Sequence, residues 1–282
     1  MKQIVVISGK GGTGKTVLTA SFAALAKNKI MVDCDVDAAD LHLLLQPEIK
    51  ERYDFRSGKT AWIDRDLCQE CGQCIDVCRF DAIRDDFTVD PISCEGCTIC
   101  SYICPEAAIK LEENLSGEWF ISDTKYGPFV HAKLGIAEEN SGKLVSKVKE
   151  AAKEIAEKEN LDYVIIDGPP GIGCPVIASL ASIDLALIVT EPTLSGIHDM
   201  ERVAEVSKHF KIPTKVVINK FDINPGNSED IKKICQEEDI EVMAQLPFSQ
   251  KVTESIVQGV PLIEFCKDRI AEDISLLWER IK

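Results

Sequence analysis

The chain of 282 residues has little basic character and no long apolar run. Against 47 Asp and Glu it carries only 32 Lys and Arg, which gives a formal net charge of −15. Phosphate contacts need clustered cations, so we expect no nucleic-acid partner and no docking on anionic lipid. No stretch approaches the ~18 apolar residues of a membrane span. Met1 leads, without a signal peptide, into the apolar run Ile4–Ile7, so we expect a cytoplasmic protein.

Histidine is also scarce. The four histidines, at 42, 131, 198 and 209, show no metal-ligand spacing. His131 lies in a strand-like stretch, where we expect a structural role; a role near a metal centre or partner is the alternative. Cysteine, by contrast, occurs 12 times. Thiols stay reduced in the cytoplasm, so this density indicates metal binding rather than disulfides.

Eight of the cysteines form two runs with the spacing C-x2-C-x2-C-x3-C. The runs are Cys68, Cys71, Cys74, Cys78 and Cys94, Cys97, Cys100, Cys104. This spacing is typical of bacterial two-cluster ferredoxins, in which the fourth cysteine of each run binds the other cluster. We therefore predict one [4Fe–4S] cluster on Cys68, Cys71, Cys74 and Cys104, and a second on Cys78, Cys94, Cys97 and Cys100. Zinc is the alternative, but it prefers paired C-x2-C units. Arg79 stands where Pro105 follows the other run, a departure that leaves all four thiols in place.

A phosphate-binding loop precedes the cysteine runs. Residues 9–16 read GKGGTGKT, which fits the P-loop pattern G-x4-G-K-[ST] between an apolar strand and a helical run. Its glycines let the backbone approach a phosphate closely, while its N–H groups supply positive potential. We predict that Lys15 reaches the β- and γ-phosphates of ATP and that Thr16 binds Mg²⁺. The predicted ATP-binding residues in the loop are Gly9, Lys10, Gly11, Gly12, Thr13, Gly14, Lys15 and Thr16.

The apolar pattern predicts an α/β fold. Expected strands are 4–7, 30–33, 163–166, 185–189, 215–218 and 241–245, and expected helices include 15–26 and 143–159. We predict a doubly wound, mostly parallel P-loop domain from residues 1–60 and 113–282, with a ferredoxin-like α+β module inserted at 61–112. Within the module the sequence repeats, since the segment 68–83 resembles 94–109. The run 269–281 is amphipathic, and we expect a docked structural helix rather than a membrane anchor.

These motifs resemble the MinD, ParA, Mrp and nitrogenase iron-protein superfamily with its deviant Walker A loop. The resemblance rests on KGGTGKT, DCDVDAADLH, DGPPGIGCPVIASL and TEPTLSGIHD, and with both cysteine runs it covers almost the whole chain. It implies a Mg²⁺-dependent ATPase that forms an ATP-bridged dimer, in which Lys10 crosses to the partner's nucleotide. A solvated loop lysine is the alternative reading of Lys10.

The resemblance also implies roles for residues outside the loop. Asp35 falls where the family orients the attacking water and is expected near Mg²⁺, with Asp33 and Asp37 as residues that exchange roles with it. Asp167 is the Walker B acid and is expected to hold Mg²⁺ through water. Gly171 is expected near the γ-phosphate, and Asn219, with Lys220 beside it, near the adenine. Pro247 and Phe248 are expected to border the base.

The remaining cysteines are less informative. Cys174 lies in the segment after Asp167, where the nitrogenase iron protein has a cluster ligand. We prefer a small buried residue at a helix start and keep the cluster role open. Cys34, Cys235 and Cys266 are expected to be packing residues.

Three functions compete at this point. The first is an ATPase whose nucleotide state gates electron transfer through two [4Fe–4S] clusters to a partner protein. The second is a maturation or carrier factor for metal clusters, although no C-x2-C of the Mrp type follows Cys104. The third is a MinD- or ParA-like positioning ATPase. The dimer is expected with a second copy or with a related ATPase. Residues 64–112 hold 11 Asp and Glu against 4 Lys and Arg, so the expected redox or metallocluster partner has a basic docking face.

Overall fold

A computed structural model describes residues 1–135 and 141–282 of the chain. The chain divides into two compact units, each with its own internal packing. The larger unit comprises Met1–Tyr53, Trp119–Lys133 and Ser141–Lys282, and the smaller comprises Asp54–Glu118 together with the stretch that begins at Leu134. The predicted insertion at 61–112 lies inside the smaller unit.

The strands form one sheet, in the order β3-β4-β5-β2-β6-β1-β7-β8-β9. Pairing is parallel from β5 through β9 in this order. The expected mostly parallel α/β fold is therefore confirmed. The strands are β1 (Lys2–Ser8), β2 (Lys29–Asp33), β3 (Glu48–Ile63), β4 (Ile109–Thr124), β5 (Gly127–Leu134), β6 (Tyr163–Pro170), β7 (Leu185–Thr190), β8 (Thr214–Asn219) and β9 (Glu241–Leu246).

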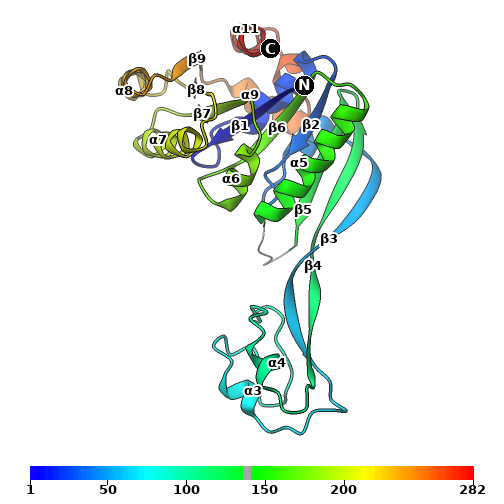
Figure 1. The fold of residues 1–282 in the computed structure, drawn as a ribbon. Coiled ribbons are helices and arrows are strands. Elements are labelled where there is room, and N and C mark those ends of the chain that lie inside the picture. The colour runs from blue at the N-terminus through cyan, green and yellow to red at the C-terminus, as the bar shows by residue number, and fades with distance from the viewer. Residues whose placement is uncertain (136–140) are drawn as a thin grey trace. The chain divides into compact units, whose positions relative to one another are not determined.

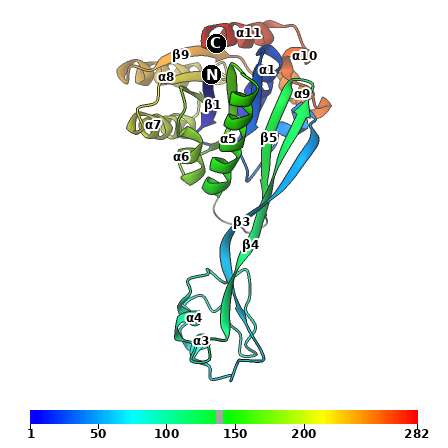
Figure 2. The same ribbon diagram turned by 45° about the vertical axis from the view of Figure 1, so that its right-hand side comes forward.

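Helices cover both faces of this sheet within the larger unit. Figures 1 and 2 show α1 and α11 on one face and α5, α6 and α7 on the other. The helices are α1 (Lys15–Leu25), α2 (Leu41–Leu45), α3 (Gln73–Asp76), α4 (Ile99–Ile103), α5 (Ser141–Lys158), α6 (Cys174–Leu180), α7 (Leu194–His209), α8 (Pro225–Glu237), α9 (Gln250–Gln258), α10 (Leu262–Phe265) and α11 (Arg269–Ile281). No helix in the described ranges is long and apolar enough to cross a membrane.

The central strands are buried on both faces, as parallel strands between two helical layers must be. In β1 the side chains from Ile4 to Ile7 are fully buried. The C-terminal helix α11 packs onto this core, where the ring of Trp278 lies 5.3 Å from that of Phe22 and 5.4 Å from that of Tyr163. The expectation of a docked structural helix at the carboxyl end is therefore confirmed.

Two long strands were not predicted. β3 and β4 have 16 residues each, and each has residues in both units. The first seven residues of β3 are all exposed, so this part of the sequence lacks the alternation of buried and exposed side chains that marks a strand. Backbone pairing with a neighbouring strand, rather than burial of side chains, defines this stretch.

The smaller unit repeats itself in backbone as well as in sequence. Left-handed residues recur 26 positions apart: Gly72 and Thr98 have φ of 80° and 71°, and Asp81 and Ala107 have φ of 50° and 49°. Short helices α3 and α4 occupy equivalent places in the two halves. Its small core consists of Ala61, Ile63, Cys74, Ile83, Cys100 and Ile109.

Candidate nucleotide site and cysteine-lined cavities

The predicted P-loop joins β1 to α1 at the carboxyl edge of the sheet. Gly12 and Gly14 have φ of 76° and 97°, a conformation that side chains with a Cβ rarely adopt. At Gly14 a Cβ would also lie 2.4 Å from the amide nitrogen of Asn219. The hydroxyl of Thr13 is buried and has no hydrogen-bond partner. An unpartnered hydroxyl in this loop is a fitting donor for a phosphate oxygen.

Buried acidic residues face the end of this loop. Asp33 and Asp167 are register partners in β2 and β6. Asp167 accepts hydrogen bonds from Thr16 and, at 3.0 Å, from the hydroxyl of Thr19. Burial raises the pKa of both Asp35 and Asp167, and the positive charge of Lys15, the buried first residue of α1, opposes this rise. The structure thus brings four of the predicted residues together: Lys15, Thr16, Asp35 and Asp167.

Burial makes these carboxyl groups harder to ionise. Burial, followed by the charge of Asp167, raises the pKa of Asp33 well above its ordinary value. Burial also raises the pKa of Asp35 to about 6, and the Lys15 charge opposes it only in part. A cation relieves such repulsion, and Mg²⁺ prefers oxygen ligands. The donor set of Thr16, Asp35 and Asp167 fits Mg²⁺.

Asp33, Asp35 and Asp37 have different surroundings. Asp33 accepts backbone hydrogen bonds from Asp35 at 3.0 Å and Leu41 at 3.2 Å, so it holds the loop in place. Asp37 is exposed, whereas Asp35 is buried beside Asp167. Of the three, Asp35 has the position best suited to the metal and to a water molecule.

Lys10 is bound within its own chain. Its ammonium group lies 2.6 Å from a carboxylate oxygen of Glu191 and donates to the hydroxyls of Thr193 at 3.1 Å and Ser195 at 3.0 Å. The alternative of a solvated loop lysine is therefore wrong for this conformation. Lys220 also pairs with Glu191, at 3.1 Å, and donates to the carbonyl of Gly12. Burial opposes the ionisation of Glu191, but hydrogen bonds from both lysines lower its pKa overall.

Glu191, which follows β7, had no predicted role. In the sequence it stands out only as part of the segment TEPTLSGIHD, which carries the family resemblance.

Asn219, which was predicted to lie near the adenine, has a side chain that already makes hydrogen bonds within the chain. Asn219 donates to the carbonyl of Thr13 at 2.8 Å and accepts from the N–H of Lys220 at 3.0 Å. Pro247 follows β9, and the backbone N–H of the exposed Phe248 donates to Asp222 at 2.7 Å.

The segment after β6 corrects one expectation. Gly171 has φ of 90°, and its N–H donates to the carbonyl of Ser8 at 2.9 Å, which ties this segment to β1. Cys174 starts α6 as expected, but it is exposed and not buried, because it lies in the first turn beyond the sheet edge. Cys34, Cys235 and Cys266 are buried, which confirms them as packing residues.

His131 is part of the core. It lies in β5, its ring stacks 4.6 Å from that of Phe129, and it shares a hydrogen bond with Ser122. Burial lowers its pKa to about 4, so the ring is neutral at pH 7. The expected structural role is confirmed.

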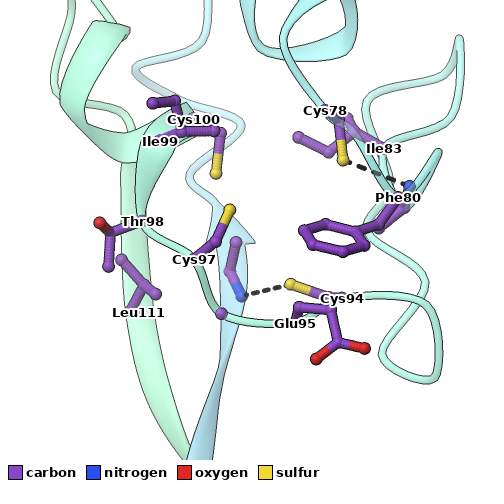
Figure 3. A pocket seen from close by; sticks show the side chains of 13 residues that line it. Cys78, Phe80, Ile83, Cys94, Glu95, Cys97, Thr98, Ile99, Cys100 and Leu111 are labelled. Carbon is purple, nitrogen blue, oxygen red and sulfur yellow. Dashed lines mark hydrogen bonds between the residues drawn. The ribbon is translucent and has the colours of Figure 1, made fainter.

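Two cavities in the smaller unit are lined by cysteines, four in each. One holds Cys78, Cys94, Cys97 and Cys100. The other holds Cys68, Cys71, Cys74 and Cys104. Each therefore combines three cysteines of one run with the fourth of the other. Figure 3 shows the sulfurs of Cys78, Cys94, Cys97 and Cys100 around one space.

Backbone amides approach the sulfurs from the surrounding loops. The N–H groups of Ala82 and Ala108 donate to Cys78 and Cys104, at 3.4 Å in both cases. Within the described ranges, no three His, Cys, Asp or Glu side chains lie close enough to share one metal ion. A four-iron cluster places its thiolates farther apart than a single ion does. The donor sets of both cavities fit such a cluster.

Comparisons with known proteins place the larger unit among nucleotide-binding proteins. Residues 4–262 match the family model of the CobQ/CobB/MinD/ParA nucleotide binding domain. The chain is 35% identical to the uncharacterized protein MJ0578 of Methanocaldococcus jannaschii, with 99% of this chain and 96% of that protein covered. It is 24% identical to the septum site-determining protein MinD of Thermotoga maritima, covering 99% and 87%. Among solved structures, MinD of Pyrococcus horikoshii with Mg-ADP has a TM-score of 0.61 at 18% identity, covering 100% and 96%.

Proposed function

Because the chain belongs to the CobQ/CobB/MinD/ParA nucleotide-binding family, we propose that it is a Mg²⁺-dependent ATPase whose nucleotide state gates electron transfer through two [4Fe–4S] clusters to a partner protein. The observation that carries the proposal is the pair of cavities that each gather four cysteines. Their composition is what the exchange of fourth cysteines between two ferredoxin clusters requires.

The nucleotide part of the proposal rests on the P-loop. Gly9–Thr16 cradles the phosphates of ATP, with the Thr13 hydroxyl as a free donor. Thr16, Asp35 and Asp167 hold Mg²⁺, which supplies positive charge against the phosphate oxygens. Asp35 orients the attacking water through its carboxylate. Asn219 and Pro247 lie toward the base.

The redox part rests on the chain's thiols and amides. A bound [4Fe–4S] cluster supplies a one-electron couple. Four cysteines hold each cluster, and N–H groups such as those of Ala82 and Ala108 stabilise negative charge on the sulfurs, which tunes the reduction potential. Full ligation by four thiols retains a cluster firmly and favours electron transfer over cluster donation.

The ATP-bound form is proposed to be a dimer, with a second copy or with a related ATPase. A MinD of Aquifex aeolicus is found in a complex with MinC, so a fold of this kind does assemble with other proteins. In the dimer Lys10 reaches the partner's nucleotide and stabilises charge on the transferred phosphoryl group. Lys10 must first leave Glu191.

The test is the reduction potential of the anaerobically purified protein, measured with ADP and with a non-hydrolysable ATP analogue. Coupling between sites is reciprocal, so a nucleotide state that gates the clusters must shift their potentials. We expect a shift on the order of 59 mV, a tenfold change for a one-electron couple. The Lys15→Ala variant serves as the control that does not respond. Equal potentials in both nucleotide states would contradict the gating.

A second candidate is a positioning ATPase, and the similarity to MinD proteins over nearly the whole chain favours it. It predicts that a protein with both Cys71→Ser and Cys97→Ser keeps its cellular function and its localisation. Loss of function with intact ATP turnover would instead favour electron transfer or cluster maturation. Unchanged function would exclude both redox readings.

A further inference from the structure

The two halves of the smaller unit are equivalent in backbone, so their side chains can be compared position by position. Residues 26 apart correspond, as the equal N–H···S contacts of Ala82 and Ala108 illustrate. The left-handed residues Gly72 and Thr98 correspond in the same way. Where the side chains at two equivalent positions differ, the two cavities have different chemical surroundings.

At two pairs of equivalent positions the lining of one cavity is apolar where that of the other is polar, although Glu95 also lines the first of these cavities. Phe80 and Ile99 line the cavity of Cys78, Cys94, Cys97 and Cys100. At the equivalent positions, Glu106 and Gln73 line the other cavity. In Figure 3 the ring of Phe80 faces the same space as the sulfurs of Cys94 and Cys97.

These apolar side chains are open to solvent. Phe80 is 41% exposed, Ile99 is 44% exposed and Tyr102 is 88% exposed. Ile99 and Tyr102 are three residues apart in α4 and so share one side of that helix. The position equivalent to Tyr102 is Asp76. The cavity of Cys78, Cys94, Cys97 and Cys100 is thus accompanied by an exposed apolar patch, Phe80, Ile99 and Tyr102, where the equivalent residues are Glu106, Gln73 and Asp76.

We propose that this apolar patch is the docking surface for a redox partner protein that has an apolar contact area ringed by Lys and Arg, so that electrons are exchanged through the cavity of Cys78, Cys94, Cys97 and Cys100. The proposal rests on the proposed function and names the face at which it acts. Exposed aromatic and aliphatic side chains grouped in this way mark protein interfaces. One electron passes to the partner, which is reduced as the cluster is oxidised, and no bond or proton changes place.

The charge around the patch selects the partner. The segment 64–112 has 11 acidic against 4 basic residues, so a basic rim on the partner is attracted over the whole approach. A second copy of this chain would bring an equal excess of negative charge, and the two would repel. The apolar patch provides the close contact with the partner, and the acidic residues around it orient the partner and raise the rate of association.

The test uses the full-length protein with its clusters and cytochrome c, a basic haem protein, as the probe. The variant Ile99→Gln with Tyr102→Asp replaces two of the three patch residues by the side chains found at their equivalents, Gln73 and Asp76, and leaves Phe80 in place. It adds a negative charge that by itself favours a basic probe, so weaker binding reports loss of apolar contact. The control is Ile92→Asp, which adds one negative charge at an exposed apolar residue that lines neither cavity.

We expect the variant to bind cytochrome c about tenfold more weakly by titration calorimetry, and to reduce it correspondingly more slowly, as removal of a central aromatic contact implies. Reduction of the small dye dichlorophenolindophenol by Tyr102→Gln, at a position that lines neither cavity, and the binding of cytochrome c by Ile92→Asp should stay within about twofold of wild type. If the double variant loses iron, Tyr102→Gln alone, at the most exposed position, replaces it.

Two results separate the possible failures. Wild-type protein that holds no iron or sulfide would overturn the proposed function and this inference together. Intact clusters with equal affinity for cytochrome c in wild type and variant would overturn the docking surface alone. Self-association of the wild type that the variant abolishes would also overturn it, because the patch would then bind a second copy.

Discussion

The ammonium group of Lys10 lies 2.6 Å from a carboxylate oxygen of Glu191, so the second lysine of the P-loop is paired within its own chain. Two hydroxyls, of Thr193 and Ser195, complete its contacts. Any role for Lys10 at a partner's nucleotide requires this pair to separate. In the proposed dimer, Glu191 would therefore compete with the partner's nucleotide for Lys10.

The first prediction follows from that competition. Glu191→Gln removes the charge that holds Lys10, and a partly buried pair of this kind is worth on the order of 1 kcal/mol. We expect dimerisation with a non-hydrolysable ATP analogue at an about fivefold lower protein concentration, measured by sedimentation velocity. Glu205→Gln, on an exposed position of α7, is the matched control. Unchanged or weaker dimerisation of Glu191→Gln would argue that Lys10 stays with Glu191 in the dimer.

The two P-loop lysines should differ in what they support. Lys15 is buried at the start of α1 beside Asp35 and Asp167. We expect Lys15→Ala to abolish nucleotide binding or turnover, since the phosphates lose their nearest cation. Lys10→Ala should keep ATP affinity within a few-fold but slow hydrolysis by about 10³, as removal of a trans-acting cation does. Titration with a fluorescent ATP analogue and a phosphate-release assay separate the two effects. Normal turnover by Lys10→Ala would refute the trans role.

Asp35 gives a pH-dependent prediction for the nucleotide-free protein. Its pKa is raised by burial from 3.8 to about 6, so the folded protein binds the proton more tightly than the unfolded chain does. Its contribution therefore destabilises the fold progressively as pH rises from about 4 to 6, and remains at that level above 6. At pH 7.5 we expect Asp35→Asn to raise the free energy of unfolding by about 1–3 kcal/mol.

The gain should be smaller at pH 5.5 and is measured by urea unfolding with EDTA present. Glu237→Gln, at an exposed position of α8, is the control and should change little. With Mg²⁺ and ATP the order reverses, because the cation then stabilises the ionised Asp35. A lower stability of Asp35→Asn at pH 7.5 without Mg²⁺ would show that the carboxylate is stabilised by contacts in the folded state.

The parts of the fold that the sequence predicts well are those with local causes. β1 carries the apolar run Ile4–Ile7, and the P-loop lies between this strand and α1 as its sequence pattern predicts. The pairing of Lys10 with Glu191 joins residues 181 positions apart, so no local pattern contains it. The exposed start of β3 has no apolar alternation to read. Cys174 was expected to be buried because small residues often are, but its exposure depends on where α6 leaves the sheet.

The exchange of fourth cysteines is testable by pairs of substitutions. Cys104 lines the same cavity as Cys71, although Cys78 is nearer to Cys71 in sequence. We expect Cys104→Ser to lose one of two clusters and to keep about four of eight irons. The double variant Cys71→Ser with Cys104→Ser should lose no further cluster, because both substitutions affect the same cluster site. Cys71→Ser with Cys78→Ser should lose both clusters.

Iron and sulfide analysis with electron paramagnetic resonance of the reduced proteins measures these outcomes. Cys174→Ser, an exposed cysteine outside both cavities, is the control and should retain both clusters. A three-iron cluster retained in a variant changes the iron count slightly but leaves the pattern of the pairs intact. The opposite pattern, with Cys71 and Cys78 acting as one site and Cys71 and Cys104 as two, would mean that each run binds its own cluster. In that case the cysteines that line one cavity would not be the ligands of one cluster.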